Sequence, residues 1–445
     1  MQKKLMIIFF LLIGYCVQLS AQQEMSLLSV DKQTYEAWLQ HDWDKLILIS
    51  KDALHAGIDF YYLRVRLGIA YYARGNYHAA LPHLEEAYRQ NQEEDYLKEY
   101  LYYTYLFTDR WAAANRLAST FPAALKQKTN TVKKPFANLF ELGYGYQGLA
   151  DQSVIDNFQS DADPVQNGYQ YIPISIHSVF AGLQHPVGNS FQFYHAFTGL
   201  SVDHFRYVQE NGTASRDNPY HTDVLQYYAA GNMSLSKNLN LIVGGHLISV
   251  FYPVTSIIVR QGRTFLLTET YSDFDYAAFA TLYQKFRYGS LGGGFTYGTV
   301  NNAKQYQADL KLTLFPFGNK NLYTTTIGTY QRQESIFGTE VNRWIVDQTL
   351  GFKVSSSLWL EGYGTLGDME NLMMNDGLIV YNRMDVINSR YGARLIVFPS
   401  AHWSVQLHYG YMNSTSSFID STTGTQQSPI NYGQHHISGL LTRKF

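Results

Sequence analysis

The chain has 445 residues, of which 16% are charged and 16% aromatic, with a formal net charge of −2 and a mean hydropathy of −0.22. This length allows two or more domains, and the near-neutral charge without a basic block excludes nucleic acid as a partner. Many aromatic residues combined with modest hydropathy favour a surface divided between lipid and water.

The first 21 residues have the pattern of an export signal. In "MQKKLMIIFFLLIGYCVQLSAQQ", Lys3 and Lys4 precede a short apolar run, and the small Ala21 lies where cleavage is expected. The only cysteine, Cys16, lies inside this segment. We therefore expect a mature chain with neither a disulfide nor a thiol nucleophile. No later window is long and apolar enough for a membrane helix, so a membrane-spanning part must be a β-barrel.

Residues 22–130 are predicted to form a helical domain with a 34-residue period. Residues separated by this step form the sets Trp43, Tyr77 and Trp111; Leu46, Ala80 and Ala114; and Ala53, Ala87 and Phe121. The middle unit, "LRVRLGIAYYARGNYHAALPHLEEAYRQN", resembles a tetratricopeptide (TPR) repeat. We expect Gly68 where the first helix packs tightly and Ala80 where the second helix approaches it. Each helix pair needs a neighbour to cover its apolar face, so the array is either a docking surface for a periplasmic partner or a rigid spacer.

Residues 136–445 alternate apolar and polar side chains, which predicts an antiparallel β-barrel of about fourteen transmembrane strands. We place the strands near 136–147, 170–183, 190–208, 221–235, 239–252, 273–286, 288–300, 302–315, 320–331, 341–353, 356–367, 386–398, 402–413 and 433–445. Short turns alternate with longer segments, read as loops at 148–169, 209–220, 253–272, 368–385 and 414–432. Residues 378–386 fit either a loop hairpin or a strand extension. The alternative, a soluble β-sandwich, leaves the apolar outward faces unexplained.

The inner face of the barrel is predicted to carry ionisable side chains of both signs. By strand parity these lumen-lining residues include Glu141, His177, His246, Asp309, Lys311, Arg343, Asp347, Arg390, Arg394 and His408. They form either a paired network that fills and stiffens the barrel or the lining of a polar channel.

Two short motifs have the spelling of catalytic or cofactor sites. "GYGYQG", with Gly143 and Gly145, falls on a strand rather than between a strand and a helix, so it favours close packing over dinucleotide binding. His436 and Ser438 have the His-x-Ser spacing of outer-membrane lipid hydrolases, but parity points them into the lumen. The adjacent His435 and His436 point to opposite faces and cannot share a metal ion. We expect no cofactor, no metal and no enzymatic activity.

The order of export signal, TPR-like repeats and C-terminal barrel resembles outer-membrane exopolysaccharide export proteins and the YaiO-like barrels. This resemblance implies a location in the outer membrane with the N-terminal domain in the periplasm. The polar lumen face beside the repeat domain leads to our first hypothesis, a lumen that passes or gates a polar solute or glycan such as an exported exopolysaccharide. In this hypothesis the helical arm binds a periplasmic protein and the barrel contacts membrane lipid. The alternatives are a non-transporting barrel that anchors the repeats to a secretion or envelope-assembly machine, and a lipid-modifying hydrolase.

The last strand, "HHISGLLTRKF", alternates and closes on Phe445. Barrel insertion machinery reads a C-terminal strand that ends in an aromatic residue, so we interpret Phe445 as a barrel-insertion signal. Arg443 is expected on the same outward face, at the depth of the lipid headgroups, where a long basic side chain is tolerated.

Overall fold

The computed structural model describes residues 25–445 apart from 134, 161, 164, 261–262 and 335–337, and the side chains of residues 255–266 lie outside the description. The expected export signal at 1–21 therefore falls outside the described residues. The chain divides into two compact units, residues 1–129 and 130–445. None of the described helices is long and apolar enough to cross a membrane.

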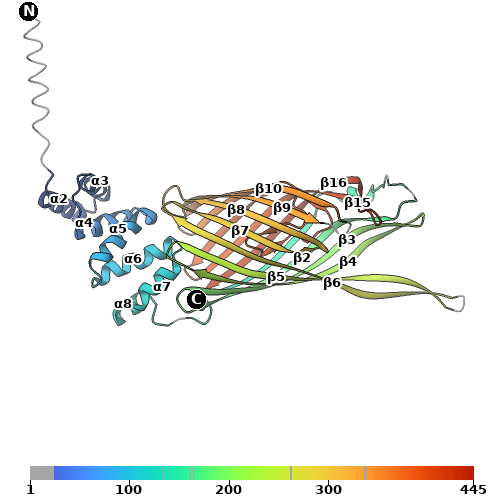
Figure 1. The fold of residues 1–445 in the computed structure, drawn as a ribbon, viewed down its shortest axis with the longest axis horizontal. Coiled ribbons are helices and arrows are strands. Elements are labelled where there is room, and N and C mark those ends of the chain that lie inside the picture. The colour runs from blue at the N-terminus through green and yellow to red at the C-terminus, as the bar shows by residue number, and fades with distance from the viewer. Residues whose placement is uncertain (1–24, 134, 161, 164, 261–262, 335–337) are drawn as a thin grey trace, which may run out of the picture. The chain divides into compact units, whose positions relative to one another are not determined.

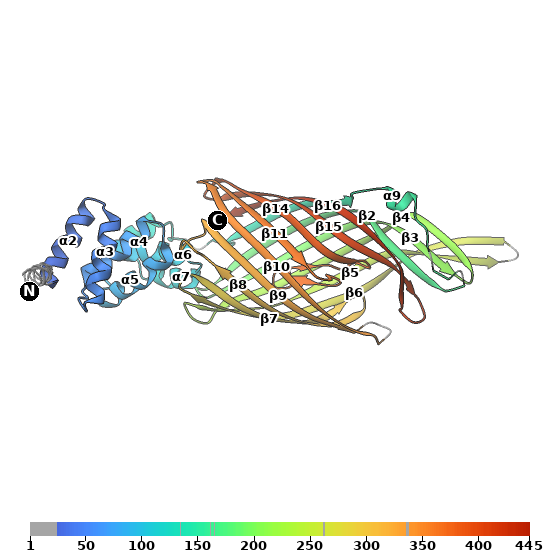
Figure 2. The ribbon, with the colours of Figure 1, turned by 90° about the horizontal axis from the view of Figure 1, so that it is seen from above.

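The first unit is a stack of helical hairpins in which neighbouring helices pack on one another (Figure 2). Its helices are α2 (Leu27–Leu39), α3 (Trp43–His55), α4 (Tyr61–Ala73), α5 (Tyr77–Gln90), α6 (Asp95–Phe107), α7 (Trp111–Ser119) and α8 (Ala123–Lys128). The starts of α2, α4 and α6 are 34 residues apart in turn, and so are the starts of α3, α5 and α7. The 34-residue period of the sequence is therefore a period of helix pairs.

The turn inside each pair repeats with the helices. His41, Gly75 and Asp109, again 34 residues apart, have φ angles of 55°, 71° and 57°. This left-handed conformation ends the first helix of each pair and is strained for most residues other than glycine. The same backbone turn thus occurs three times. Only the middle turn has glycine, the residue that adopts this conformation without strain.

Small residues let the paired helices approach closely. A Cβ atom added at Gly68 would lie 2.6 Å from Cδ2 of Leu84, which is fully buried on α5. Leu46, Ala80 and Ala114 occupy the equivalent position in the three successive helix pairs, and all three are buried. Trp43 and Tyr71 pack against the resulting core. Deeper in the stack, burial and the nearby Glu85 carboxylate raise the pKa of Tyr105, which donates a hydrogen bond to that carboxylate (2.9 Å).

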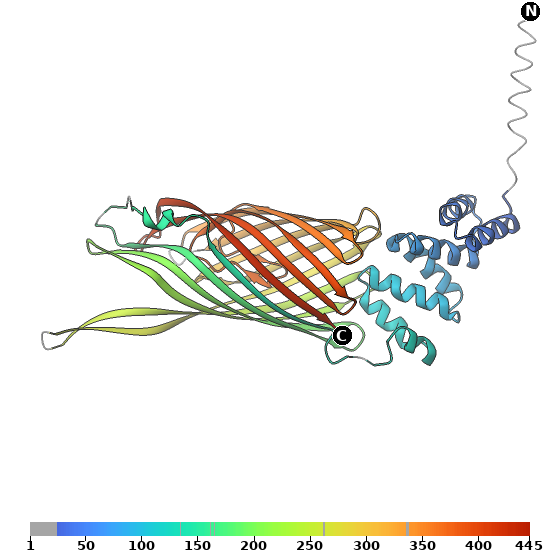
Figure 3. The same ribbon diagram turned by 180° about the vertical axis from the view of Figure 1, so that it is seen from behind.

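The second unit is a closed antiparallel barrel of fourteen strands among the described residues, which confirms the predicted fold class (Figure 1). The barrel strands are β1 (Leu139–Leu149), β2 (Gly168–Val187), β3 (Phe191–Glu210), β4 (Thr213–Ser234), β5 (Leu239–Arg260), β6 (Arg263–Phe286), β7 (Gly289–Val300), β8 (Ala303–Leu314), β9 (Leu322–Glu334), β10 (Glu340–Ser355), β11 (Leu358–Leu366), β14 (Val386–Ser400), β15 (Trp403–Asp420) and β16 (Gln426–Lys444). Strand β1 pairs with β16 and closes the ring (Figure 3).

Three of the predicted loops are wrong, because the strands are longer than the part that alternates. Residues 209–220 and 414–432 belong mostly to β3, β4, β15 and β16, with short turns between them. Strands β5 and β6 continue as a two-stranded ribbon through residues 253–260 and 263–272, which Figure 1 shows projecting beyond the other strands. Above the membrane no lipid enforces an apolar outer face, so these strands lack the pattern of a span.

Two predicted loops are present. One, between β1 and β2, carries the short helix α9 (Ser153–Asp156) (Figure 2). Its Ile155 and Phe158 pack against Phe205 and Tyr207 of β3. The other joins β11 to β14 and contains β12 (Met373–Met374) and β13 (Ile379–Val380), which pair only with each other. Of the two readings of residues 378–386, the loop hairpin is therefore correct.

Candidate functional site: the barrel interior

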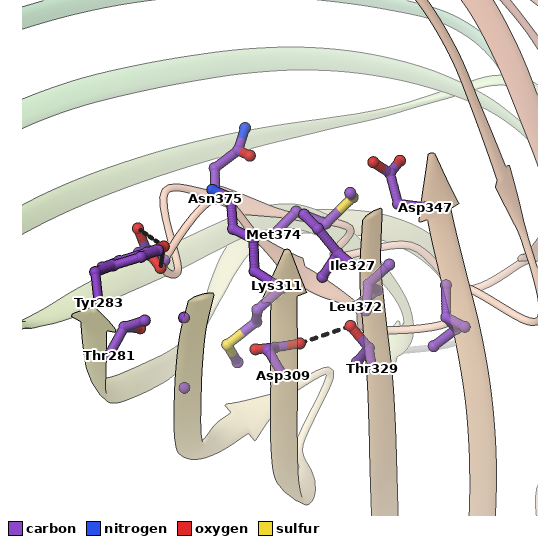
Figure 4. A pocket seen from close by; sticks show the side chains of 15 residues that line it. Thr281, Tyr283, Asp309, Lys311, Ile327, Thr329, Asp347, Leu372, Met374 and Asn375 are labelled. Atoms are coloured by element: carbon purple, nitrogen blue, oxygen red, sulfur yellow. Dashed lines mark hydrogen bonds between the residues drawn. The ribbon is translucent and has the colours of Figure 1, made fainter. Parts of the chain in front are cut away.

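The loop of residues 367–385, called the inward loop below, lies inside the barrel. Met374 and Asn375 of this loop line a pocket together with Asp309, Lys311 and Thr329 of the inner wall (Figure 4). At the base of the loop, Met369 and Leu372 are buried against Ile345, Ile387 and Met412 of the wall. The segment is thus a packed part of the interior.

Side chains of the wall bind the backbone of the inward loop. Gln307 on β8 donates to the Met373 carbonyl oxygen (2.6 Å) and accepts from the Met373 N–H (3.1 Å), as a neighbouring strand would. Gln331 on β9 donates to the Glu370 carbonyl oxygen (3.0 Å). The imidazole Nδ1 of His246 lies 2.7 Å from the Gly377 carbonyl oxygen on the far side of the loop. These bonds replace the backbone pairing that the loop gives up by leaving the sheet.

Charged and phenolic groups add further attachments. Arg343 on β10 forms an ion pair with Glu370. Tyr283 on β6 donates to the Asp376 carboxylate (2.7 and 2.9 Å). Arg383, on the same loop, donates to Gln434 of β16 (2.6 Å). The loop is therefore fixed to strands on several sides of the barrel.

A second polar cluster covers the inner wall of β10, β11, β14 and β15. Asp347 pairs with Arg390 (3.3 Å), and Glu361 pairs with Arg394 (2.6 Å). Strand register places Glu361 opposite Arg394 on the adjacent strand. Direct cross-strand neighbours of opposite charge stabilise a sheet, and inside the barrel each charge also offsets the other's desolvation.

Ser438 of β16 does not use His436 as its partner. Its hydroxyl lies 3.4 Å from Nδ1 of His408 on the neighbouring strand, and Nε2 of His408 lies 2.8 Å from the Tyr363 hydroxyl. The rings of His408 and His436 are 4.9 Å apart. The His-x-Ser spacing thus points both groups inward but does not join them as a nucleophile and base.

Gly143 and Gly145 of "GYGYQG" also lie on the inner wall. A Cβ atom at Gly145 would lie 2.6 Å from the Ser178 hydroxyl and 3.4 Å from Nε2 of His436. Gly143 pairs across the sheet with Phe180 of β2. Close packing of side chains over these positions is what requires glycine there, in keeping with the packing interpretation of the motif.

Between the inward loop and the wall lies a cavity of about 850 Å³. Asp347, Arg390, Arg394 and His408 line it on one side. Ile176, Phe180, Leu200, Val202, Val224 and Val250 line it on the β2–β5 side. The parity argument alone suggested a polar interior on every side. The structure instead shows one polar side and one apolar side.

The structure places nine of the ten predicted lumen-lining residues on the inner face. Glu141 accepts hydrogen bonds from Tyr194 and Thr442, and His246, Asp309, Lys311 and Arg343 surround the inward loop. Asp347, Arg390, Arg394 and His408 line the cavity.

The prediction for His177 is wrong. His177 pairs across the sheet with the outward-facing Tyr146, and its Nδ1 lies 2.7 Å from the hydroxyl of Tyr144, another outward residue. On β2 the inner face itself carries apolar side chains, Ile176 and Phe180, so polarity does not identify the inner face of this strand.

Several residues of the interior were missed. Glu361 and Tyr363 share a face of β11, and the single charge in "LWLEGYGTL" would have revealed them. Glu370, Asp376 and Arg383 lie on the inward loop. No sequence signal shows that a polar loop folds back inside a barrel. Among the described residues, no three histidine, cysteine, aspartate or glutamate side chains come together as a metal site would require.

The outer face of the barrel is apolar. Trp344 is 74% exposed, and the large side chains on the outer face include Leu142, Val179, Phe197, Leu225, Leu310, Leu366, Leu407 and Ile437. A closed barrel has no unpaired edge, and an apolar outside with charges inside matches hydrocarbon around a polar interior. These features define a transmembrane β-barrel.

Solved structures to which the chain is similar include the following bacterial proteins. A FadL homologue of Pseudomonas aeruginosa is 10% identical with a TM-score of 0.42, covering 69% of this chain and 90% of its own. The toluene transporter TodX of P. putida is 8% identical with a TM-score of 0.43, covering 70% and 91%. A bacterial polysaccharide outer membrane secretin is 8% identical with a TM-score of 0.34, covering 70% and 100%. This likeness concerns the fold and assigns no function.

No protein family matches the sequence. No curated protein matches it either.

Proposed function

We propose that this protein is an outer-membrane channel for small solutes and that the inward loop is its gate. The observation that carries the proposal is the position of the loop, which fills part of a barrel whose remaining interior is a cavity of about 850 Å³. The loop is attached largely by hydrogen bonds and an ion pair, which water can replace when the loop moves. A barrel built only as an anchor needs no such internal space.

The contacts of the inward loop are also incomplete, which favours movement. Asn382 Nδ2 and Arg383 Nη1 on the loop, and His246 Nε2 on the wall, are buried without a protein partner. A buried polar group without a partner costs about 1–3 kcal/mol. These unpaired groups raise the free energy of the closed state. The difference in free energy between the closed and open states is therefore smaller than it would be if every buried polar group had a partner.

The inward loop favours a small solute over an exported polymer. A polymer needs a continuous path through the barrel, whereas the loop and the wall enclose a cavity of the size that holds one drug-sized molecule. Polysaccharide export therefore requires the loop to leave the barrel as a whole, while passage of a small molecule requires only a local shift.

Single-channel recording in a planar bilayer tests the channel. The wild-type protein is expected to show rare openings, and a variant with residues 370–383 replaced by a short Gly-Ser linker is expected to show a larger and more persistent conductance. A loop-deleted barrel that folds but stays silent would overturn the proposal. That result would support the alternative, a barrel that anchors the helical domain.

We further propose that the helical unit lies in the periplasm and docks a partner protein. Leu28, Tyr62 and Tyr96, which occupy equivalent positions of α2, α4 and α6, are 77%, 52% and 40% exposed. Tyrosine is enriched at protein interfaces, so two exposed tyrosines at equivalent positions favour an interface here. The chain enters β1 at Leu139, which pairs with Lys444, so the helical unit is connected to the barrel end where both terminal strands meet.

Site-specific photo-crosslinking in the full-length protein in its own membrane tests this docking surface. A crosslinker at position 62 is expected to capture a periplasmic protein, and the adduct should disappear in a Tyr96→Ser background. A crosslinker at the exposed Lys45 on α3 is the control. Equal capture at both positions, or none at position 62, would favour the rigid-spacer role.

A further inference from the structure

The cavity beside the inward loop has two chemically different sides. Ile176, Phe180, Leu200, Val202, Val224 and Val250 supply aliphatic and aromatic surface from β2 to β5. Leu378, Ile379 and Val380 of the inward loop add to this apolar lining. Together these residues offer a continuous apolar bed to one part of an occupant.

The other side offers hydrogen-bond donors. Both Arg394 and Glu361 line the cavity, but the Arg394 side chain is 39% exposed and the Glu361 side chain only 9%, so the guanidinium is the more accessible of the two charges. One N–H group of Arg394 is given to Glu361 (2.6 Å), and a guanidinium has five. Ser438 and Gln406 line the same side and can donate as well. This side therefore suits an oxygen acceptor.

We propose that this cavity binds a small amphiphile, with its hydrocarbon part on the β2–β5 side and an acceptor oxygen, best a carboxylate, at Arg394. A guanidinium binds a carboxylate through two parallel N–H···O bonds. The proposal rests on the channel function for the role of this amphiphile as a transported solute, but the binding itself does not require transport.

Two simpler occupants fit less well. A sugar or other polyol can form hydrogen bonds with Arg394 and Ser438. Its remaining hydroxyl groups would then face the apolar lining, which offers them no hydrogen-bond partner. A pure hydrocarbon fills the apolar bed but removes water from the free edge of the Arg394 guanidinium without replacing its hydrogen bonds, which is unfavourable. Only a molecule with both parts matches both sides.

Binding of octanoate to the full-length protein in lipid nanodiscs, measured by titration calorimetry against empty nanodiscs, tests the proposal. Octanoate is expected to bind, and glucose is expected to bind far more weakly. Arg394→Gln should weaken octanoate binding about tenfold or more, the range for loss of hydrogen bonds to a charged group. Leu200→Asn, which places an amide on the apolar side, should also weaken it.

Matched variants separate binding from folding. Arg394→Gln combined with Glu361→Gln keeps the wall neutral and should show the same loss of octanoate binding. Arg332→Gln breaks an exposed ion pair with Glu340 on the same barrel and should leave binding unchanged. Glucose binding tighter than octanoate, no octanoate binding to the folded wild type, or unchanged affinity in both Arg394 variants would overturn the proposal. Octanoate binding without any conductance would overturn only the channel, and conductance without octanoate binding only the amphiphile site.

Discussion

Arg343 and Glu370 form an ion pair that joins strand β10 to the inward loop, and the two side chains are only 8% and 19% exposed. The guanidinium of Arg343 also donates to Gln333 (2.9 Å), which orients it toward the loop. This pair is the one ionic contact between the described wall and loop residues whose two side chains are both largely shielded from water, so it is a natural latch.

Replacing Glu370 by Gln should therefore open the gate more often. Removing one member of a buried ion pair leaves an uncompensated charge and costs about 3–5 kcal/mol, a cost that falls on the closed state alone. We expect a clear rise in open probability in single-channel recordings. Glu340→Gln is the control, since it breaks the exposed pair with Arg332, which water screens and which contributes little to stability. Recordings that are identical for the two variants would show that the pair does not hold the loop.

Gly68→Ala should destabilise the helical unit although alanine favours helices. Alanine is better than glycine in a helix by about 0.8–1 kcal/mol, but its Cβ would lie 2.6 Å from the buried Leu84 side chain. Overpacking of this kind costs about 1–3 kcal/mol. We expect a lower urea midpoint in unfolding followed at the helix band of circular dichroism. Ala73→Val, on the exposed end of the same helix, should change the midpoint little, and a higher midpoint for Gly68→Ala would refute the packing argument.

Gly75→Ala should also destabilise the helical unit, for a backbone reason. Gly75 has a φ of 71°, and a left-handed residue with a Cβ costs about 1–2 kcal/mol. Gly75→Asp should cost less, because aspartate tolerates this conformation and occupies the equivalent position at 109. In the same unfolding measurement, the urea midpoint should be highest for the wild type, lower for Gly75→Asp and lowest for Gly75→Ala. Equal midpoints for the two variants would show that the turn is not restrictive.

Deletion of Phe445 should impair barrel assembly, whereas Arg443→Tyr should not. The Arg443 guanidinium lies 5.3 Å from the ring centre of Trp403 and 4.7 Å from that of Phe445, on the outward face. A tyrosine can take the same place between these rings at the membrane surface. The amount of heat-modifiable barrel in outer-membrane fractions measures assembly. Normal amounts after the deletion would argue against the role of Phe445 as an insertion signal.

The sequence predicts the membrane-crossing parts of the barrel well because each span must show an apolar outside. Every barrel strand matches a predicted one, since lipid forces a period of two over the membrane-crossing length. The same reason explains the errors at 209–220, 253–272 and 414–432. Outside the membrane the strands continue without that constraint, and their polar composition looks like that of loops.

The interior is less predictable, because parity gives a face but not its chemistry. Alternation places Asp309 and Arg394 correctly on the inner face, but it also places His177 there, which is wrong because the inner side of that strand is apolar. The contribution of Glu370 depends on the path of a whole loop, which local patterns do not encode. Long-range contacts of this kind are set by the tertiary fold.

The pairing of β1 with β16 has a consequence for how the molecule is made. Leu139 and Lys444 are bonded neighbours across the seam although almost the whole barrel sequence separates them. The other neighbouring strands of the ring follow one another in the chain, so the ring grows by short steps and ends at one seam, where β1 meets β16 and the end of β2 meets β15. Until that step, two strand edges stay open and can pair with other chains. Closure of the seam is therefore the step that completes the barrel and removes the open edges at which it could aggregate.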